Sequence, residues 1–273
     1  MLEVRTARIG SFEMDYVLSD REDLPVLAFV HGLSANLQQF EGQLEYFNGE
    51  YRVLLFSLRG HGGSEYPQPA TRENFSLHKM AEDCEVLLEQ LNIAAVHWVG
   101  NSMGGLVGYE LLETSPQRLL SLTTFGTTAQ LHYGEFAVKL MTWAKDVMIK
   151  IKGYEGFARF AGRASRKNGD VQEQIVEMIQ AAAPEVVRYA HMNIGDYDYR
   201  GVLDKAQLPL LLMRCEYDKA INKSLDSTLA VLQNHSLADI VELPEAGHFA
   251  NLDRPDEFNR ILHGWLGKNR AGV

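Results

Sequence analysis

Short apolar runs recur along the chain and alternate with longer stretches whose apolar positions follow a helical period. The runs lie at residues 26–30, 53–56, 96–99, 119–125 and 210–213, with a weaker one at 240–243. Several are apolar without alternation, as expected of strands covered by helices on both faces of a parallel sheet. The pattern therefore predicts an α/β fold with right-handed crossovers in a mostly parallel twisted sheet flanked by helices.

Two helices are marked clearly. Ser76 can cap a helix whose apolar positions form one stripe, and Pro255 suits the first turn of another. The stripe of the first helix consists of Leu77, Met80, Ala81, Cys84, Leu87, Leu88 and Leu91. Residues 5–18 predict a leading antiparallel hairpin that turns near Gly10.

Residues 130–201 break this rhythm, because they contain no convincing strand. Helical patterns occupy 136–151, 154–166, 171–182 and 185–193. An all-helical insertion in an α/β chain predicts a lid over the sheet. We expect a core domain formed by residues 1–129 and 202–273, and a helical cap formed by residues 130–201.

Composition and charge exclude some classes of protein. Hydrophobic residues make up 46% and charged residues 23%, which is ordinary for a globular enzyme. The net charge of −10 disfavours nucleic acid and anionic membrane surfaces as partners. No segment approaches the roughly 20 apolar residues of a membrane span. The start lacks a signal-peptide pattern, and Cys84 and Cys215 resemble small buried hydrophobes, so a cytoplasmic location is expected.

The sharpest chemical signal is the sequence Gly-Asn-Ser-Met-Gly at residues 100–104, between a predicted strand and a helical pattern. A sharp strand-to-helix turn strains the backbone of its central residue and leaves room only for very small neighbours. The Ser102 hydroxyl then stands clear of the sheet at the positive end of a helix dipole. Ser102 is therefore the candidate nucleophile.

A serine nucleophile needs a base and a group that orients the base. His248 follows the last predicted strand and Asp218 follows the strand at 210–213, so both lie where strand ends gather around a ligand crevice. Glu216 is the nearest rival to Asp218. Two weaker candidates lie at the end of the helical insertion, Asp196 and Asp198.

The oxyanion of a tetrahedral intermediate needs backbone donors, each contributing on the order of 3 kcal/mol. The N–H of Met103 is one candidate, and that of Leu33 is the other, because Gly32 lets the loop turn close to the substrate. His31 is expected to orient this loop. Residues 59–64, Arg-Gly-His-Gly-Gly-Ser, lack the ending of a phosphate loop and are expected to border the site. No metal-ligand spacing occurs, so neither a metal nor a cofactor is implied.

Together these motifs resemble the α/β-hydrolase superfamily, over nearly the whole chain outside the helical insertion. The residues that carry the resemblance are His31-Gly32, the loop 59–64, the turn 100–105, Asp218 and Gly247-His248. The resemblance implies the α/β-hydrolase fold, serine-based hydrolysis and a cap domain at residues 130–201. The most similar branches are small bacterial esterases, enol-lactone hydrolases and carbon–carbon bond hydrolases of ring-cleavage products.

Some positions depart from the family pattern. The family usually has Asp at the position of Ser57, often Gly at that of Cys215, and Pro where Ile221-Asn222 stand. Carbon–carbon hydrolases usually carry Trp after the catalytic histidine, where this chain has Phe249. The resemblance therefore favours a carboxylic ester or lactone substrate.

The apolar content of the predicted cap suggests a small hydrophobic substrate. The candidates for contact with it are His31, Gly32, Trp143 and Phe249. Two alternatives remain: a carbon–carbon bond hydrolase, and a ligand sensor that retains the triad. The sequence leaves the oligomeric state open.

Overall fold

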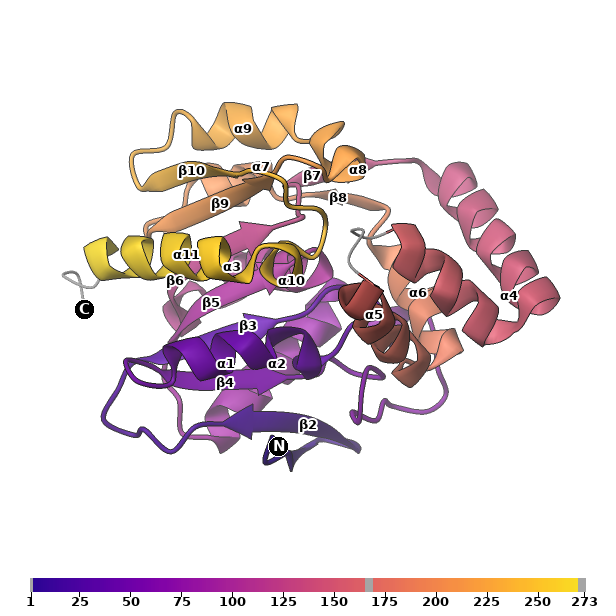
Figure 1. The fold of residues 1–273 in the computed structure, drawn as a ribbon, viewed down its shortest axis with the longest axis horizontal. Helices are drawn as coiled ribbons and strands as arrows, with labels where there is room; N and C mark the ends of the chain where they lie inside the picture. The colour runs from indigo at the N-terminus through magenta and orange to yellow at the C-terminus, as the bar shows by residue number, and fades with distance from the viewer. Residues whose placement is uncertain (1, 165–168, 270–273) are drawn as a thin grey trace.

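The computed structural model describes residues 2–164 and 169–269. Eight strands form one sheet (Figure 1). In spatial order they are β1 (Arg5–Ile9), β2 (Phe12–Leu18), β4 (Arg52–Phe56), β3 (Val26–Val30), β5 (Val96–Asn101), β6 (Leu119–Phe125), β9 (Leu210–Cys215) and β10 (Ala238–Leu243). The last six strands in this order, β4, β3, β5, β6, β9 and β10, pair in parallel. Strand β2 is antiparallel to both of its neighbours.

Helices cover both faces of the sheet, as the unbroken apolar strands require (Figure 1). One face packs against α2 (Leu77–Gln90), α3 (Met103–Thr114), α7 (Arg200–Asp204) and α9 (Asp226–Leu232). The other face packs against α1 (Glu41–Phe47) and α11 (Pro255–Asn269). Short helical turns are α8 (Lys219–Asn222), α10 (Ala250–Asp253), η1 (Leu37–Phe40), η2 (Glu73–Phe75) and η3 (Pro116–Arg118).

The mostly parallel sheet flanked by helices, which the sequence predicts, is confirmed. Strands β3 and β6 have the predicted bounds, and β5 and β9 extend two residues further than their apolar runs. The leading hairpin is present, with Ile9 opposite Phe12. The hydroxyl of Ser76 accepts a hydrogen bond from the N–H of Lys79 at 3.3 Å, which is the predicted N-cap.

The insertion is mostly helical and comprises α4 (Glu135–Ala164), α5 (Gly169–Ala181) and α6 (Pro184–Asn193), here called the cap helices. Gly153, at φ 71°, interrupts α4 between the two helices predicted there. The expectation that this region holds no strand is wrong, because β7 (Gln130–His132) and β8 (Asp196–Asp198) pair antiparallel at its two ends. Each strand has three residues, which is too short for a period to be visible in the sequence.

The cap helices rest on the loops at the carboxyl edge of the sheet. Ile175 and Ile179 of α5 belong to a buried cluster that also contains Ala35, after β3, and Phe249, after β10. From α6, Val186 packs so closely on the loop after β4 that a Cβ on Gly60 would lie 2.3 Å from its methyl carbon. The insertion therefore covers the edge where the predicted catalytic residues lie.

Candidate active site

Ser102 occupies a strained turn between β5 and α3. Its φ of 50° and ψ of −115° place a residue with a side chain in a region that such residues rarely adopt. The flanking glycines are required by close packing. A Cβ on Gly100 would lie 2.4 Å from the carbonyl oxygen of Gly104, and one on Gly104 would lie 2.2 Å from that of Val30. The turn thus has the strained serine and the closely packed glycines on which the prediction of a nucleophile rests.

His248 and Asp218 form a hydrogen-bonded pair. The Nδ1 atom of His248 lies 2.6 Å from Oδ2 of Asp218. The aspartate is 6% exposed, and its other oxygen accepts the N–H of Ile221 at 3.3 Å. A buried carboxylate on Nδ1 fixes the ring orientation and leaves Nε2 free to accept a proton.

Contacts at the carboxyl edge bring the His248 loop to the serine turn. The side-chain amide of Asn101, the residue before the serine, donates to the carbonyl oxygen of His248 at 3.0 Å. The N–H of Ser102 donates to the carbonyl oxygen of Phe125 at 3.0 Å. After Phe125, a Cβ on Gly126 would lie 3.1 Å from the imidazole of His248. Ser102, His248 and Asp218 are therefore gathered at one edge of the sheet.

The other three candidate carboxylates contact groups other than the His248 ring. Glu216 is exposed and accepts the N–H of Glu245 at 2.8 Å. Asp196 lies 2.7 Å from a ring nitrogen of His132, and Asp198 forms a 2.7 Å ion pair with the neighbouring Arg200. Asp218 is thus the one of these four carboxylates that contacts the His248 ring.

The loop after β3 approaches the serine closely. A Cβ on Gly32 would lie 3.1 Å from the Cβ of Ser102, so glycine is needed for this approach. Within the part of the chain that the structure describes, the N–H groups of Leu33 and Met103 have no hydrogen-bond partner. Two unpartnered amides on the segments that flank a serine are suited to bind a developing oxyanion.

His31 does not face a substrate. Its ring is fully buried, Nδ1 lies 2.7 Å from the carbonyl oxygen of Gly32, and Nε2 accepts the N–H of Leu58 at 2.9 Å. Burial and the nearby His61 ring hold the pKa of His31 well below its usual value, so the ring is neutral. Both nitrogens are occupied within the protein, which corrects the expectation of substrate contact and agrees with the loop-orienting role.

The two predicted aromatic contacts lie in different surroundings. Trp143 is 62% exposed on the outer side of α4. Phe249 is 8% exposed and belongs to the cluster that joins α5 to the core, with its ring centroid 5.7 Å from that of His248. Phe249 therefore lies beside the His248–Asp218 pair, whereas Trp143 faces solvent.

Sequence reasoning did not assign a role to Asp15, on β2. Its carboxylate accepts the N–H of Gly63 at 2.9 Å and lies 2.9 Å from the hydroxyl of Ser64. Ser57, where the family usually has Asp, accepts the N–H of Leu37 at 3.2 Å. A carboxylate from the neighbouring strand thus supports the loop after β4. The one available signal was the absence of an acid at position 57.

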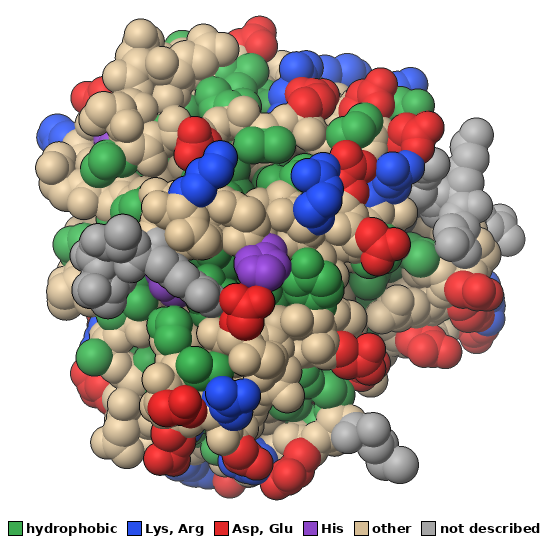
Figure 2. Space-filling view, turned by 60° about the vertical axis from the view of Figure 1, so that its left-hand side comes forward, with side chains coloured by type: hydrophobic (Ala, Val, Ile, Leu, Met, Phe, Trp, Pro, Cys, Tyr) green, Lys and Arg blue, Asp and Glu red, His purple; other side chains and the backbone are tan. Residues whose placement is uncertain are grey.

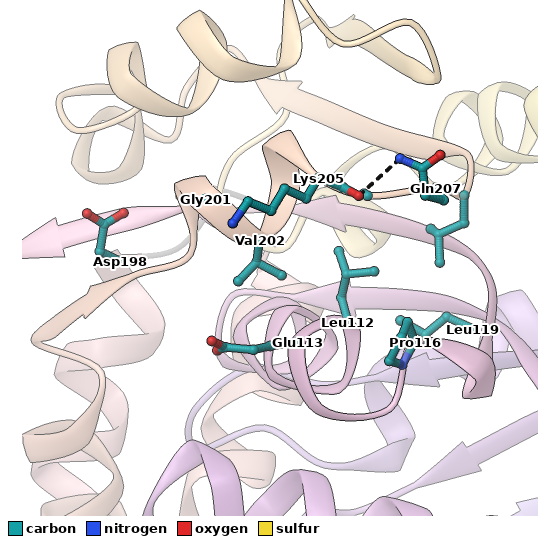
Figure 3. A pocket seen from close by; sticks show the side chains of 11 residues that line it. Leu112, Glu113, Pro116, Leu119, Asp198, Gly201, Val202, Lys205 and Gln207 are labelled. Carbon is teal, nitrogen blue, oxygen red and sulfur yellow. Dashed lines mark hydrogen bonds between the residues drawn. The ribbon is translucent and has the colours of Figure 1, made fainter.

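A separate hollow lies away from these residues. It has a volume of about 680 Å³ and is lined by residues of α3, η3, α7 and the start of β6, including Leu112, Pro116, Leu119 and Val202 (Figure 3). Leu119 begins β6, so the hollow extends toward the amino ends of the parallel strands, opposite to the serine turn. Among residues 2–164 and 169–269 we find no cluster of side chains suited to hold a metal ion.

Comparison with known proteins identifies the family. The family model described as alpha/beta hydrolase fold matches residues 25–255. The 3-oxoadipate enol-lactonase 2 of Acinetobacter baylyi is 26% identical and covers 91% of each chain. The pimeloyl-[acyl-carrier protein] methyl ester esterase of Aeromonas salmonicida is 26% identical over 89% of this chain and 96% of that protein.

Solved structures agree on the fold. The enol-lactonase of Burkholderia xenovorans superposes with a TM-score of 0.82 at 22% identity, covering 96% of this chain and 100% of that one. A thermophilic esterase from Thermogutta terrifontis gives 0.83 at 24% identity, covering 98% and 99%. The match to the family model extends from before β3 to the start of α11 and so includes the serine turn, Asp218 and His248. The chain belongs to the α/β-hydrolase fold family, as a hydrolase with enol-lactonase and esterase relatives.

Proposed function

We propose that the chain is a serine hydrolase that cleaves a carboxylic ester or lactone of a small hydrophobic substrate through an acyl-enzyme on Ser102. The observation that carries this proposal is the assembly at one sheet edge. There the strained Ser102 turn, the 2.6 Å contact between His248 and Asp218, and two unpartnered amides lie on neighbouring loops. The names of the enol-lactonase and esterase relatives support the same bond class.

The geometry supports acyl transfer to water. The hydroxyl of Ser102 attacks the substrate carbonyl carbon while Nε2 of His248 takes its proton. The N–H groups of Leu33 and Met103 bind the resulting oxyanion. When the carbonyl re-forms, the leaving oxygen departs with the proton from His248, and water then attacks the acyl-enzyme with the same base. The carboxylate of Asp218 stabilises the charged imidazole. No step requires a cofactor.

In this proposal the core is formed by residues 1–129 and 202–273, and residues 130–201 are the cap. Because α5 packs against Phe249, the cap closes the site next to the base. Exclusion of water strengthens the interactions that stabilise the oxyanion. The cap is therefore the element that should set substrate size.

The test is a comparison of Ser102→Ala with Ser227→Ala, which changes a serine on α9. Ser102→Ala should abolish cleavage of p-nitrophenyl esters and labelling by a fluorophosphonate, whereas Ser227→Ala should retain both. Lactones and a vinylogous diketone in the same panel separate ester, lactone and carbon–carbon cleavage. Undiminished activity in folded Ser102→Ala would refute the assignment of Ser102 as the nucleophile. Ligand-dependent melting without turnover would favour a sensor.

A further inference from the structure

Large hydrophobic side chains gather on the outer face of α4. Phe136 is 81% exposed, Trp143 is 62% exposed and Ile151 is 75% exposed, and Leu140 is also exposed. Their spacing of four, three and eight residues places them on one side of a helix, with half-buried Val147 between the last two. We call these four residues the α4 stripe. A contiguous exposed apolar surface of this kind marks an interaction site.

The α4 stripe is not needed to hold α4 in place. The opposite side of the helix is buried through Val138 and Thr142, and α4 packs on α5 and α6. In Figure 1, α4 forms the right-hand edge of the molecule, with α5 and α6 between it and the sheet. The stripe is therefore a protruding ridge, which suits a deformable surface better than a partner that would have to supply a matching groove.

The charge of α4 is opposite to that of the whole chain. Residues 135–164 contain six Lys and Arg and three Asp and Glu, a net charge of +3, whereas the chain carries −10. The basic residues are Lys139, Lys145, Lys150, Lys152, Arg159 and Arg163. Of these, Lys145 is half-buried and donates to the carbonyl oxygen of Val187, and Lys139 and Arg159 form exposed ion pairs with Glu135 and Glu155. Lys150 is exposed next to Ile151 of the stripe. On the face opposite to α4, acidic and basic side chains are spread over the whole visible surface (Figure 2).

We propose that the protein docks on a bilayer surface containing anionic lipid, with α4 lying in the headgroup plane and the α4 stripe inserted among the acyl chains. Exposed Trp, Phe and aliphatic residues beside lysines are the features of such interfacial helices. A second copy is disfavoured, because a two-fold contact through α4 would oppose two helices of net positive charge. Within the described residues, no helix has the length and apolarity needed to cross a membrane.

The experiment is flotation of the full chain with phosphatidylcholine vesicles, with and without phosphatidylglycerol. We expect binding only with phosphatidylglycerol, and weaker binding at high salt. The variant Phe136→Ser/Leu140→Ser/Ile151→Ser should bind at least about a hundredfold more weakly, because three apolar side chains no longer leave water. Lys150→Ala should weaken binding about fivefold.

Trp143 provides a direct readout of insertion. Lipids brominated in the acyl chain should quench its fluorescence, and Trp143→Phe should lose the quenched component while still floating. The buried Trp98 and Trp265 remain as an internal reference in that variant. Quenching that is the same in Trp143→Phe would show that α4 does not insert.

The matched control is Val4→Ser/Leu237→Ser, which removes exposed apolar side chains elsewhere and should bind like the unmodified chain. Melting temperatures verify that all variants fold. Equal flotation of the triple variant and the unmodified chain would overturn the proposal. Absence of binding to phosphatidylglycerol vesicles would also overturn it. So would light scattering that shows a dimer for the unmodified chain and a monomer for the triple variant.

Discussion

Asp218→Asn is the sharpest test of the proposed catalytic pair, His248 and Asp218. The aspartate oxygen that lies 2.6 Å from Nδ1 of His248 accepts the ring proton, and the second oxygen accepts the N–H of Ile221 at 3.3 Å. An amide must turn its NH₂ toward one of these two donors. If Ile221 keeps the amide oxygen, the NH₂ faces Nδ1, and the imidazole is held in the tautomer that carries its proton on Nε2. It then cannot act as a base.

The loss expected for a wrong tautomer is about 10⁴-fold in kcat/KM, or about 5 kcal/mol of transition-state stabilisation. The assay is p-nitrophenyl ester hydrolysis, with circular dichroism and melting temperature to verify the fold. Because the amide is nearly the same size as the carboxylate, the fold should be retained. The loss should therefore appear mainly in kcat.

Glu216→Gln is the matched control, since Glu216 is the nearest carboxylate in sequence and bonds to the backbone of Glu245. It should retain kcat/KM within about threefold, because loss of an exposed interaction is worth well under 1 kcal/mol. Retention of activity within tenfold in Asp218→Asn, or an equal loss in Glu216→Gln, would refute the assignment of the acid.

Three further changes test how the site is built. Asp15→Ala should lower the free energy of unfolding in urea by about 1–3 kcal/mol, because the N–H of Gly63 loses its acceptor; no change would mean that the loop after β4 does not depend on this carboxylate. Gly104→Ala should lower stability by about 1–3 kcal/mol or more, because a Cβ would lie 2.2 Å from the carbonyl oxygen of Val30, whereas Gly264→Ala, in open space on α11, should be neutral or stabilising. Burial lowers the pKa of His61 from 6.5 to about 4, so the unfolded chain takes up a proton before the folded chain as pH falls. The free energy of unfolding should therefore fall by up to about 3 kcal/mol between these pH values, and His61→Asn should reduce that fall in pH-dependent urea titrations.

The sequence predicts those elements whose own residues show a clear pattern, such as an unbroken apolar run or closely spaced glycines. An unbroken apolar run such as 26–30 can be satisfied only by a strand buried on both faces, and β3 has those bounds. Ser102 is recognisable as a candidate because the turn around it is packed so closely that only glycine fits on both sides. Asp218 and His248 followed from their positions after strands, since parallel strands bring their carboxyl ends to one edge.

Features that depend on distant partners could not be predicted in this way. The polar strands β7 and β8 are held by pairing with each other across 64 or more residues. An apolar residue on a helix indicates that one face is apolar but not which surface covers it, so the sequence predicts a substrate contact for Trp143 although its side chain faces solvent. The sequence predicts a substrate contact for the ring of His31 because it does not show that both ring nitrogens already have hydrogen-bond partners.

A buried chain of side-chain amides holds the segments at the carboxyl edge of the sheet in position relative to one another. Gln39 donates to Asn101, next to the candidate nucleophile, and to Asn251, on the short helix after His248, each at 3.1 Å. Asn251 in turn donates to Gln43 at 2.9 Å. An amide both donates and accepts, so such a chain can be buried without adding a charge beside His248 and Asp218. Because a buried polar group left unpaired costs about 1–3 kcal/mol, displacement of one segment is opposed by the others. These neutral contacts therefore help to fix the position of the His248 loop relative to Ser102.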